Sequence, residues 1–400
     1  MIPCYIPYGG YWSTPFARWQ GSLSHLHSLR FAAHVARDAL QRRNIEPTVF
    51  DLGILGMTVP QEGSFYGAPW LLGEIGARSI GGPTVAQACA TGARAVRLAA
   101  SELTTGDASA CLVVAADRTS NGPDLYYPDP GAIGGSGRHE HWVLDNFDRD
   151  PYAQVAMVET AENVARRYDI DTAEQNDWTV CRYVQYGEAL ADDSAFLRRF
   201  MTLPFEVPDA RLRKTHAMLD GDEGVYATTA DGLARLRPVR EGGTVTYGGQ
   251  THPADGNAGM ILTTAERLAE FTTQPRIGIR LAAFAQAREE SGYMPAAPVP
   301  AAQEALRKAG ITVADLSAVK THNPFIVNDI VLGRALGLGP EAMNRFGSPL
   351  VWGHPISPTG LRCQIELIEE LVLRGGGYGL FTGCAAGDSA MAVVIHVGDR

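Results

Sequence analysis

The sequence predicts an α/β fold of two similar halves, because units of a helix followed by a strand occur near both ends of the chain. Residues 91–116 combine a helical apolar pattern, a stop at Gly106 and a short apolar strand. Residues 360–396 combine a helix, three consecutive glycines and two apolar strands, and residues 300–319 form a third unit of this kind. Such units are typical of buried mixed sheets covered by helices, so we expect duplicated α/β layers.

The middle of the chain has a different composition, because it is richer in Asp, Tyr, Pro and Gly. Helical patterns at 157–168 and 172–192 interrupt long polar segments, which is typical of a loop domain that lines a substrate site. Residues 294–300 contain three prolines and predict a rigid connector. The expected divisions are an N-terminal half at 1–116 with 249–270 returning to it, a loop domain at 117–248, and a C-terminal half at 271–400.

Composition excludes several classes of protein. The chain has 34 basic and 44 acidic residues, a net charge of −10 and no basic run, which argues against a nucleic-acid surface. No apolar stretch approaches the length of a membrane span, and the start shows no signal peptide. The six cysteines form no CxxC pair, so we expect free thiols in a reducing, cytoplasmic compartment.

Cys89 is the first candidate for a nucleophile. It lies in the segment 87–92, Gln-Ala-Cys-Ala-Thr-Gly, directly before the first predicted helix. Unpaired N–H groups and the macrodipole at a helix N-terminus favour a thiolate, which can attack a carbonyl carbon. A buried small residue is the alternative, since free cysteines are among the most buried residue types. The segment alone leaves both interpretations open.

Three further reactive residues lie in turn-like surroundings. His322 follows a predicted strand, His354 lies in Gly-His-Pro before a predicted helix, and Cys384 lies at a predicted turn between two strands. Each has a structural alternative, because a lone histidine near Gly and Pro, or a lone cysteine, is more often structural. Together with Cys89 they supply two thiols and two imidazoles where α/β folds place chemistry.

These segments resemble the thiolase family across nearly the whole chain. Thiolases carry Cys-x-Ser/Thr-Gly, as at 89–92, Gly-His-Pro before a helix, as at 353–355, and a second cysteine near the C-terminus, as at Cys384. Thr-Ala-Glu-Asn at 160–163 and Asp-Glu-Gly-Val at 222–225 also match motifs of the family's loop domain, in the family's order.

The resemblance implies a thiolase fold, with duplicated α/β/α/β/α layers and an inserted loop domain. It implies a CoA-dependent acyltransferase that cleaves a 3-oxoacyl-CoA, or forms one by Claisen condensation, through an acyl-cysteine. The implied roles are Cys89 as nucleophile, His354 as base, His322 and His354 as donors to an enolate, Cys384 as acid and base, the backbone N–H groups of Cys89 and Ala386 as an oxyanion hole, and Met157, Thr251 and Phe325 as contacts for coenzyme A.

The resemblance also implies partners. Coenzyme A would be a co-substrate, with no permanently bound cofactor, and the chain would form a homodimer or tetramer. Some histidine-type thiolases work with a small zinc-containing OB-fold subunit. No metal site is expected in this chain, because His139, Glu140 and His141 lack a third ligand at useful spacing. Gly134–Gly137 lacks the remainder of a P-loop, so we expect a flexible loop tip there.

Departures from the family pattern leave alternatives open. His322 stands where most thiolases have asparagine, as in the branch that includes the sterol-carrier-protein type, and Ala386 replaces a glycine. Trp352 suggests a pocket for a bulky or aromatic acyl group, or else a buried structural tryptophan. The segments expected to contact coenzyme A also depart from the family pattern. This departure favours a second possible function, an acyltransferase or condensing subunit that works in a complex without free CoA. A non-catalytic scaffold is disfavoured, because the nucleophile is present.

Overall fold

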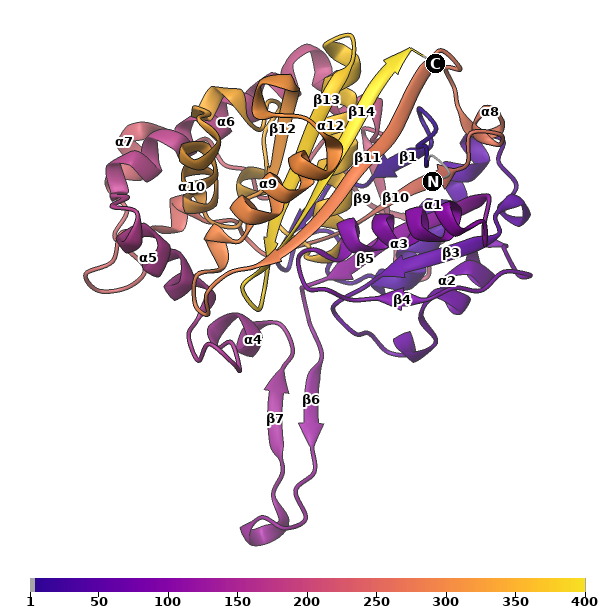
Figure 1. Ribbon diagram of the computed structural model, residues 1–400. Helices are drawn as coiled ribbons and strands as arrows, with labels where there is room; N and C mark the ends of the chain where they lie inside the picture. The colour runs from indigo at the N-terminus through magenta and orange to yellow at the C-terminus, as the bar shows by residue number, and fades with distance from the viewer. Residues whose placement is uncertain (1–3, 400) are drawn as a thin grey trace.

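The computed structural model describes residues 4–399 and contains two large sheets packed through helices (Figure 1). The strands of the first sheet are β1 (Tyr11–Ser13), β2 (Ala17–Arg18), β3 (Leu52–Gly56), β4 (Thr84–Val85), β5 (Ala110–Arg118) and β10 (Ala254–Thr263). Those of the second sheet are β11 (Ile277–Arg288), β12 (Leu316–His322), β13 (Gly377–Ala385) and β14 (Ser389–Asp399). Their orders are β1-β10-β5-β3-β4, with β2 beside β10, and β11-β14-β13-β12.

The two sheets repeat one pattern of strands. In the first, β3 and β5 are parallel, and β10 and then β1 follow as antiparallel neighbours. In the second, β12 and β13 are parallel, and β14 and then β11 follow in the same way. The predicted duplication of the α/β halves is therefore confirmed. Strand β10 returns to the first sheet from beyond the middle region. We therefore propose three domains: an N-terminal half made of 1–116 and 249–270, a loop domain at 117–248, and a C-terminal half at 271–400.

Helices form three layers around these sheets. The helices concerned are α1 (Ser28–Arg42), α2 (Gly67–Ile75), α3 (Thr91–Thr105), α9 (Pro298–Ala309), α10 (Ile326–Leu336) and α12 (Ser357–Leu373). Helices α1 and α2 pack on the first sheet, and α9 packs on the second. Helices α3 and α12 contact each other and strands of both sheets, so they form the central layer. The result is the predicted α/β/α/β/α order, and α12 is buried on all sides over 357–371.

The middle of the chain supplies the remaining longer elements. These are β6 (Asp124–Tyr127), β7 (Arg138–His141), α4 (Leu144–Asp148), α5 (Met157–Arg167), α6 (Thr172–Ser194), β8 (Phe205–Pro208), β9 (Thr215–Leu219) and α7 (Ala230–Ala234). Two short helices, α8 (Leu268–Phe271) and α11 (Pro349–Trp352), lie outside this region. The helices predicted at 157–168 and 172–192 are confirmed. The β6–β7 hairpin extends far from both sheets, with the predicted Gly134–Gly137 tip at its end (Figure 1).

Two local predictions are wrong. The proposed rigid connector at 294–300 is helical, since Pro298 begins α9 after a 3₁₀ turn. Proline is well suited to the first helical turn, where its missing N–H has no intrahelical partner. Cys384 lies inside β13 rather than in a turn, because the turn begins two residues later. In that strand its side chain is held within a fully paired ladder.

A buried polar network ties α6 and α10 to the end of β12. The Arg182 guanidinium lies 2.8 Å from the Asp329 carboxylate, and both side chains are fully buried. Asp329 also accepts hydrogen bonds from Thr321, Asn323 and Asn344, at 2.6, 2.7 and 3.0 Å. The carboxylate is therefore fully paired, which a buried charge requires. Because Thr321 and Asn323 flank His322, this network holds the backbone on both sides of that histidine.

Replacement of Asp329 by alanine is expected to lower the free energy of unfolding by about 3–5 kcal/mol, because it leaves a buried guanidinium unpaired. Urea denaturation measures the loss. Arg345→Ala is the matched control, since its ion pair with Glu188 is half exposed on both sides and exposed pairs contribute about 0–1 kcal/mol. Equal losses in the two variants would contradict the structural role of the network.

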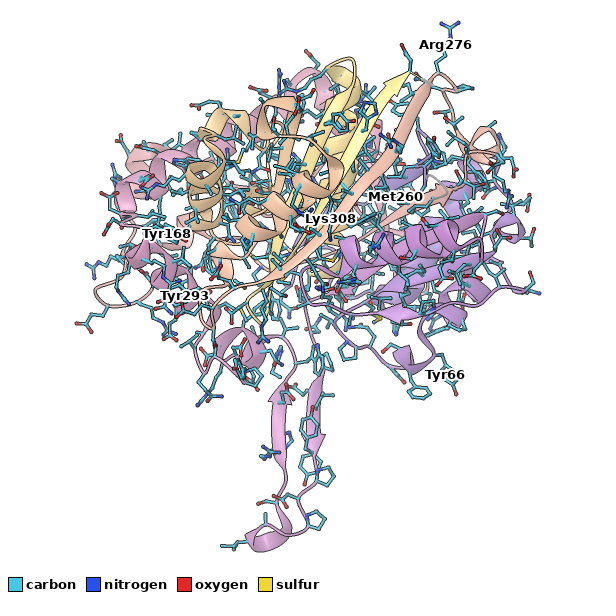
Figure 2. All side chains as sticks on the ribbon, viewed as in Figure 1. Tyr66, Tyr168, Met260, Arg276, Tyr293 and Lys308 are labelled. Atoms are coloured by element: carbon cyan, nitrogen blue, oxygen red, sulfur yellow. The ribbon has the colours of Figure 1, made fainter. Side chains whose placement is uncertain are left out.

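The surface and interior differ as expected for a packed α/β protein (Figure 2). Tyr66 points outward from the turn before α2 and is 70% exposed, whereas Met260 of β10 is fully buried. No helix among residues 4–399 has the length and apolar character needed to span a membrane.

Candidate active site

Cys89 lies in a tight turn two residues before α3, as the sequence predicts. The Thr91 hydroxyl donates to the Ala88 carbonyl at 2.7 Å and accepts from the Gln87 N–H at 2.7 Å, which closes the turn. Ala88 has a φ of 43°, an uncommon value for a residue with a Cβ, and such strain is often found at functional sites. A Cβ at Gly92 would lie 2.6 Å from the Leu361 backbone nitrogen, so glycine lets α3 and α12 cross closely here.

His354 faces the Cys89 sulfur from the segment that leads into α12. Its Nε2 lies 3.1 Å from Cys89 Sγ, and its Nδ1 lies 2.7 Å from the Thr359 hydroxyl oxygen. When Nδ1 donates to Thr359, Nε2 is free to accept the thiol proton. Gly353, with a φ of 96°, supplies the left-handed turn that aims this histidine. The pair thus has the arrangement of a nucleophile, a base and an orienting group.

His322, the last residue of β12, completes the cluster. Its ring centroid lies 4.2 Å from that of His354. One ligand-type atom from each of Cys89, His322 and His354 lies within 4.8 Å of the others. The His322 side chain is 1% exposed, and neither ring nitrogen has a hydrogen-bond partner within residues 4–399. A buried polar group without a partner costs free energy, so both nitrogens are available to a bound molecule.

Cys384 approaches the same site from β13. Its side chain is fully buried and packs with Phe325 in one apolar cluster. Burial raises the pKa of the Cys384 thiol, the nearby Cys89 thiolate charge raises it further, and a hydrogen bond with the Asn328 side chain opposes the rise. The two sulfurs therefore interact electrostatically, although they come from opposite ends of the chain.

Burial makes the resting site neutral. It raises the pKa of Cys89 to about 11, against the hydrogen bonds from the Ala386 and Cys89 backbone N–H groups. Burial also lowers the pKa of His322 to about 3, and burial and His322 together lower that of His354. For Cys89 the loss of hydration outweighs these hydrogen bonds, so the pKa shift opposes the resting thiolate that the helix N-terminus was expected to favour.

Comparison with known proteins identifies the family. Residues 11–266 match the thiolase N-terminal domain and residues 276–397 match the thiolase C-terminal domain. The chain belongs to the thiolase family. Acetyl-CoA acetyltransferase of Paracoccus denitrificans is 28% identical over 386 residues, which cover 96% of this chain and 97% of the relative. Beta-ketothiolase BktB of Cupriavidus necator is 28% identical over 391 residues, with 96% of each chain covered.

Solved structures support the thiolase fold. Acetyl-CoA acetyltransferase of Bacillus anthracis superposes with a TM-score of 0.89, 25% identity and 99% of each chain covered. Human mitochondrial 3-ketoacyl-CoA thiolase in complex with CoA superposes with a TM-score of 0.88 at 24% identity, covering 99% of this chain and 98% of that one. Together with the named relatives, these matches make the chain an acyltransferase of the thiolase family.

The residues expected to contact coenzyme A lie in segments that pack near Cys384 or are joined to such a segment. The Thr251 backbone N–H donates to the Pro324 carbonyl at 2.8 Å, which joins the Thr251 and Phe325 segments. Phe325 is buried beside Cys384, and Met157, the first residue of α5, packs on the same apolar cluster. The Thr251 hydroxyl donates to the Pro349 carbonyl, so only its lone pairs remain for a ligand.

Sequence reasoning missed several groups that shape the thiolase site. Thr359 orients His354, Asn328 bonds Cys384, and Asp117 anchors the approach to α12. Cys89 also packs against an apolar cluster of Val59, Val143 and Ile356, as do Trp19, Trp142 and Phe147.

Asp117, at the end of β5, fastens three segments of the site. Its carboxylate accepts from the backbone N–H groups of Thr58, Val59 and Ser357 at 2.8–2.9 Å, and from the Thr58 hydroxyl at 2.6 Å. Ser357 begins α12, three residues after His354. The carboxylate therefore fixes the start of α12 relative to the first sheet.

Asp117→Asn is expected to destabilise the protein by about 2–3 kcal/mol, because an amide nitrogen would face buried N–H donors. We also expect lower kcat, since the His354 segment loses its anchor. Asp51→Asn is the matched control: Asp51 accepts from Ser109 and Ala110 at the other end of β5. Thermal unfolding and turnover should separate the two, and an equal loss of activity in both would contradict the positioning role of Asp117.

Trp352 has a structural role. Its ring is fully buried, 4.0 Å from the Arg362 guanidinium and 5.4 Å, edge to face, from the Phe16 ring. Arg362 in turn forms buried ion pairs with Asp222 and Glu366. The tryptophan therefore covers a charged network in the core, which is the second of the two interpretations that the sequence left open.

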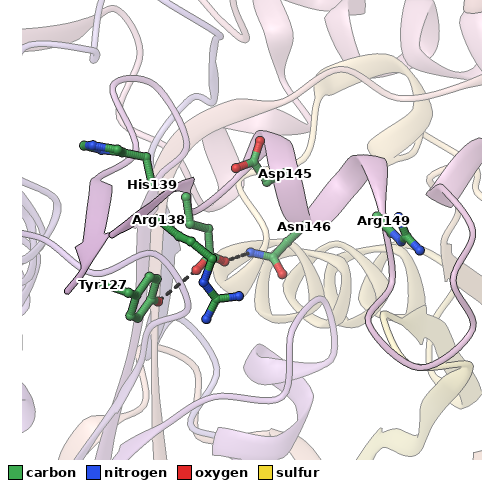
Figure 3. A pocket seen from close by; sticks show the side chains of 7 residues that line it. Tyr127, Arg138, His139, Asp145, Asn146 and Arg149 are labelled. Atoms are coloured by element: carbon green, nitrogen blue, oxygen red, sulfur yellow. Dashed lines mark hydrogen bonds between the residues drawn. The ribbon is translucent and has the colours of Figure 1, made fainter. Parts of the chain in front are cut away.

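A separate polar pocket of about 380 Å³ lies at the base of the hairpin (Figure 3). Within it, Glu140 accepts from the Tyr127 hydroxyl at 2.8 Å and from the Asn146 amide at 2.7 Å. His141 accepts from the Leu144 N–H at 3.1 Å, so its Nδ1 has a structural partner. Among the described residues, only Cys89, His322 and His354 form a cluster of three or more potential metal ligands.

Proposed function

We propose that this chain is a CoA-dependent thiolase that cleaves a 3-oxoacyl-CoA, or forms one by Claisen condensation, through an acyl-Cys89 intermediate. The observation that supports this most directly is the 3.1 Å contact between Cys89 Sγ and His354 Nε2, with Thr359 behind the imidazole. Both groups are neutral at rest because burial raises the pKa of the thiol and lowers that of the imidazole. Proton transfer then accompanies attack rather than preceding it.

In the cleavage direction, Cys89 attacks the 3-keto carbon and passes its proton to His354 Nε2. Backbone N–H groups of Cys89 and Ala386 point toward the Cys89 sulfur, which supports their role as donors to the oxygen of the tetrahedral adduct. Collapse of the adduct breaks the bond between the α- and β-carbons and leaves the acyl group on sulfur. Loss of one such oxyanion donor typically costs about 10²–10³ in rate.

The departing fragment is the enolate of an acyl-CoA. His322 has two unpartnered ring nitrogens, so its N–H can donate to the enolate oxygen, with His354 beside it. Cys384 then donates a proton to the α-carbon, and removes that proton in the synthetic direction. Since Cys384 is fully buried, the proton moves between the thiol and bound substrate. Free coenzyme A finally accepts the acyl group from Cys89, near Met157, Thr251 and Phe325.

The apolar cluster around Cys89 bears on the acyl group. Trp142, which follows β7, and Phe147 of α4 pack on the same apolar cluster as Cys89, so we propose that they limit acyl size. The Trp142 indole N–H donates to the Thr58 carbonyl at 2.8 Å, which fixes that ring. The burial of Trp352 removes the original reason to expect a bulky or aromatic acyl group, and short acyl groups fit the observed packing better.

The remaining interpretations concern partners. A homodimer or tetramer, a small zinc-containing OB-fold subunit and a cytoplasmic location stay predictions from the sequence. The second candidate function is acyl transfer in a complex without free CoA. The observation that motivates it is the Thr251 hydroxyl, which donates its hydrogen to the Pro349 carbonyl and therefore cannot donate it to a ligand.

One assay separates the two functions. Purified protein is given acetoacetyl-CoA and longer or aromatic 3-oxoacyl-CoA esters, with and without free coenzyme A, and loss of substrate is measured by chromatography. Thiolysis that requires free coenzyme A, and is fastest with short acyl groups, is expected. Acyl-enzyme formation without any transfer to coenzyme A would contradict the thiolase proposal and favour the complex.

A further inference from the structure

Cys89, His322 and His354 come from a turn, a strand end and a loop, yet their sulfur and ring nitrogens converge on one point. The ligand-type atoms lie within 4.8 Å of one another, and the contact between sulfur and His354 Nε2 is 3.1 Å. A tetrahedral zinc ion has bonds of about 2.3 Å to sulfur and about 2.0–2.1 Å to nitrogen, which places two ligands about 3.5 Å apart. The 3.1 Å contact and the 4.8 Å upper limit are compatible with that spacing after small side-chain shifts.

We propose that Cys89, His322 and His354 form a three-ligand site for a zinc-like divalent cation, and that the bound cation blocks the nucleophile. Thiolate and imidazole donors together select zinc and its neighbours over calcium or magnesium, which require oxygen ligands. This site goes beyond the proposed reaction, and only its inhibitory consequence rests on that function.

Two further observations support a ligand at this point. Both His322 nitrogens are buried and unpartnered within the described chain, so a ligand there satisfies a polar group that is otherwise left bare. The distal nitrogen of His354 is held at 2.7 Å by the Thr359 hydroxyl, the kind of outer contact that orients metal-binding histidines.

The geometry also determines what the cation does. Three protein ligands leave a fourth tetrahedral position open. On binding, the Cys89 S–H bond is replaced by a sulfur–metal bond, and the proton leaves to solvent. The lone pair needed to attack the 3-keto carbon is then engaged. Acyl transfer and cation binding therefore exclude each other.

The first test measures binding without turnover. Metal-free protein is titrated with Zn²⁺ against a chromophoric chelator and with Co²⁺ as a spectroscopic substitute. We expect one ion per chain and a thiolate-to-cobalt absorption band. Cys89→Ala and His322→Asn should each weaken binding at least about 100-fold, and Thr359→Val about 10–100-fold. Cys181→Ala should bind as the unmodified protein does, because this cysteine lies on α6, outside the ligand set.

Results that overturn the site are equally specific. Equal Zn²⁺ affinity in the unmodified protein and Cys89→Ala, or a cobalt spectrum without the thiolate band, would show that the ion binds elsewhere or only adventitiously. Using two different ligand variants, each checked for an unchanged thermal transition, keeps misfolding from imitating the expected loss. None of these readouts depends on thiolase activity.

The second test concerns inhibition. Zn²⁺ added before acetyl-CoA should prevent the acetyl adduct on intact mass, and EDTA should restore it. Protein acetylated first should no longer show the thiolate-to-cobalt band. Normal acetylation of the zinc-loaded protein would overturn the inhibitory part of the proposal. If no acyl-CoA acylates even the metal-free protein, the proposed function fails while the binding result stands.

Discussion

Cys89→Ala is expected to reduce thiolysis at least about 10⁴-fold, the scale of loss when a covalent nucleophile is removed. Cys89 is the thiol that His354 Nε2 faces at 3.1 Å, and the Thr359 hydroxyl holds the orientation of that imidazole. Without the sulfur no acyl-enzyme can form, so no other group in the cluster can compensate. Incubation with acetyl-CoA followed by intact mass spectrometry should show one acetyl adduct on the unmodified protein and none on the variant.

Cys181→Ala serves as the matched control for this experiment. Cys181 is partly exposed, as Cys89 is, but it lies on α6 outside the catalytic cluster. The control should acylate and turn over normally. An acetyl adduct that survives in Cys89→Ala, mapped to another cysteine, would assign the nucleophile elsewhere and remove the basis of the mechanism.

Much of this site could be predicted from the sequence, because its strongest signals are local. The turn that holds Cys89 is closed by Thr91, two residues away, and Gly353 directly precedes His354. The helix-then-strand units that define the two halves are likewise local patterns of apolar residues. Their pairing into a duplicated sheet follows from the rules for mixed α/β folds.

The parts that the sequence could not predict depend on tertiary packing. Burial raises the pKa of Cys89, and that burial is set by segments far from it in the chain. Phe147 lies in a polar stretch, and only the tertiary fold brings it onto the apolar cluster that Cys89 also contacts. Trp352 lies two residues before His354 in sequence, yet its ring packs on Arg362, where it covers an ion pair.

The proposed metal-ligand cluster could not be predicted from the sequence, because it also depends on tertiary packing. Spacing in the sequence identifies ligands that share a helix or a tight loop, which is why His139 and His141 were considered as a metal site. Here the three ligand side chains belong to different halves of the fold, and the duplication itself brings them together. The loop before α3 carries the sulfur, and the end of β12 and the loop before α12 carry the imidazoles.

Cys384→Ala is expected to separate the two halves of the reaction. The variant should still acquire an acetyl group on Cys89, because its nucleophile and base are intact. It should lose about 10²–10⁴-fold in exchange of the acetyl-CoA methyl hydrogens with deuterium, the usual contribution of a positioned acid or base. Exchange is followed by mass spectrometry of acetyl-CoA in heavy water.

Cys111→Ala provides the control for removing a buried sulfur. Cys111 is fully buried in β5, as Cys384 is in β13, but it packs in the core rather than at the site. It should lose stability without losing exchange. If Cys384→Ala exchanges deuterium as fast as Cys111→Ala, the proton must come from another side chain of the cluster, and His354 and His322 are the candidates once Cys89 carries the acyl group. The thiol near the C-terminus would then serve the packing around Phe325, and the acid and base roles would both belong to the imidazoles.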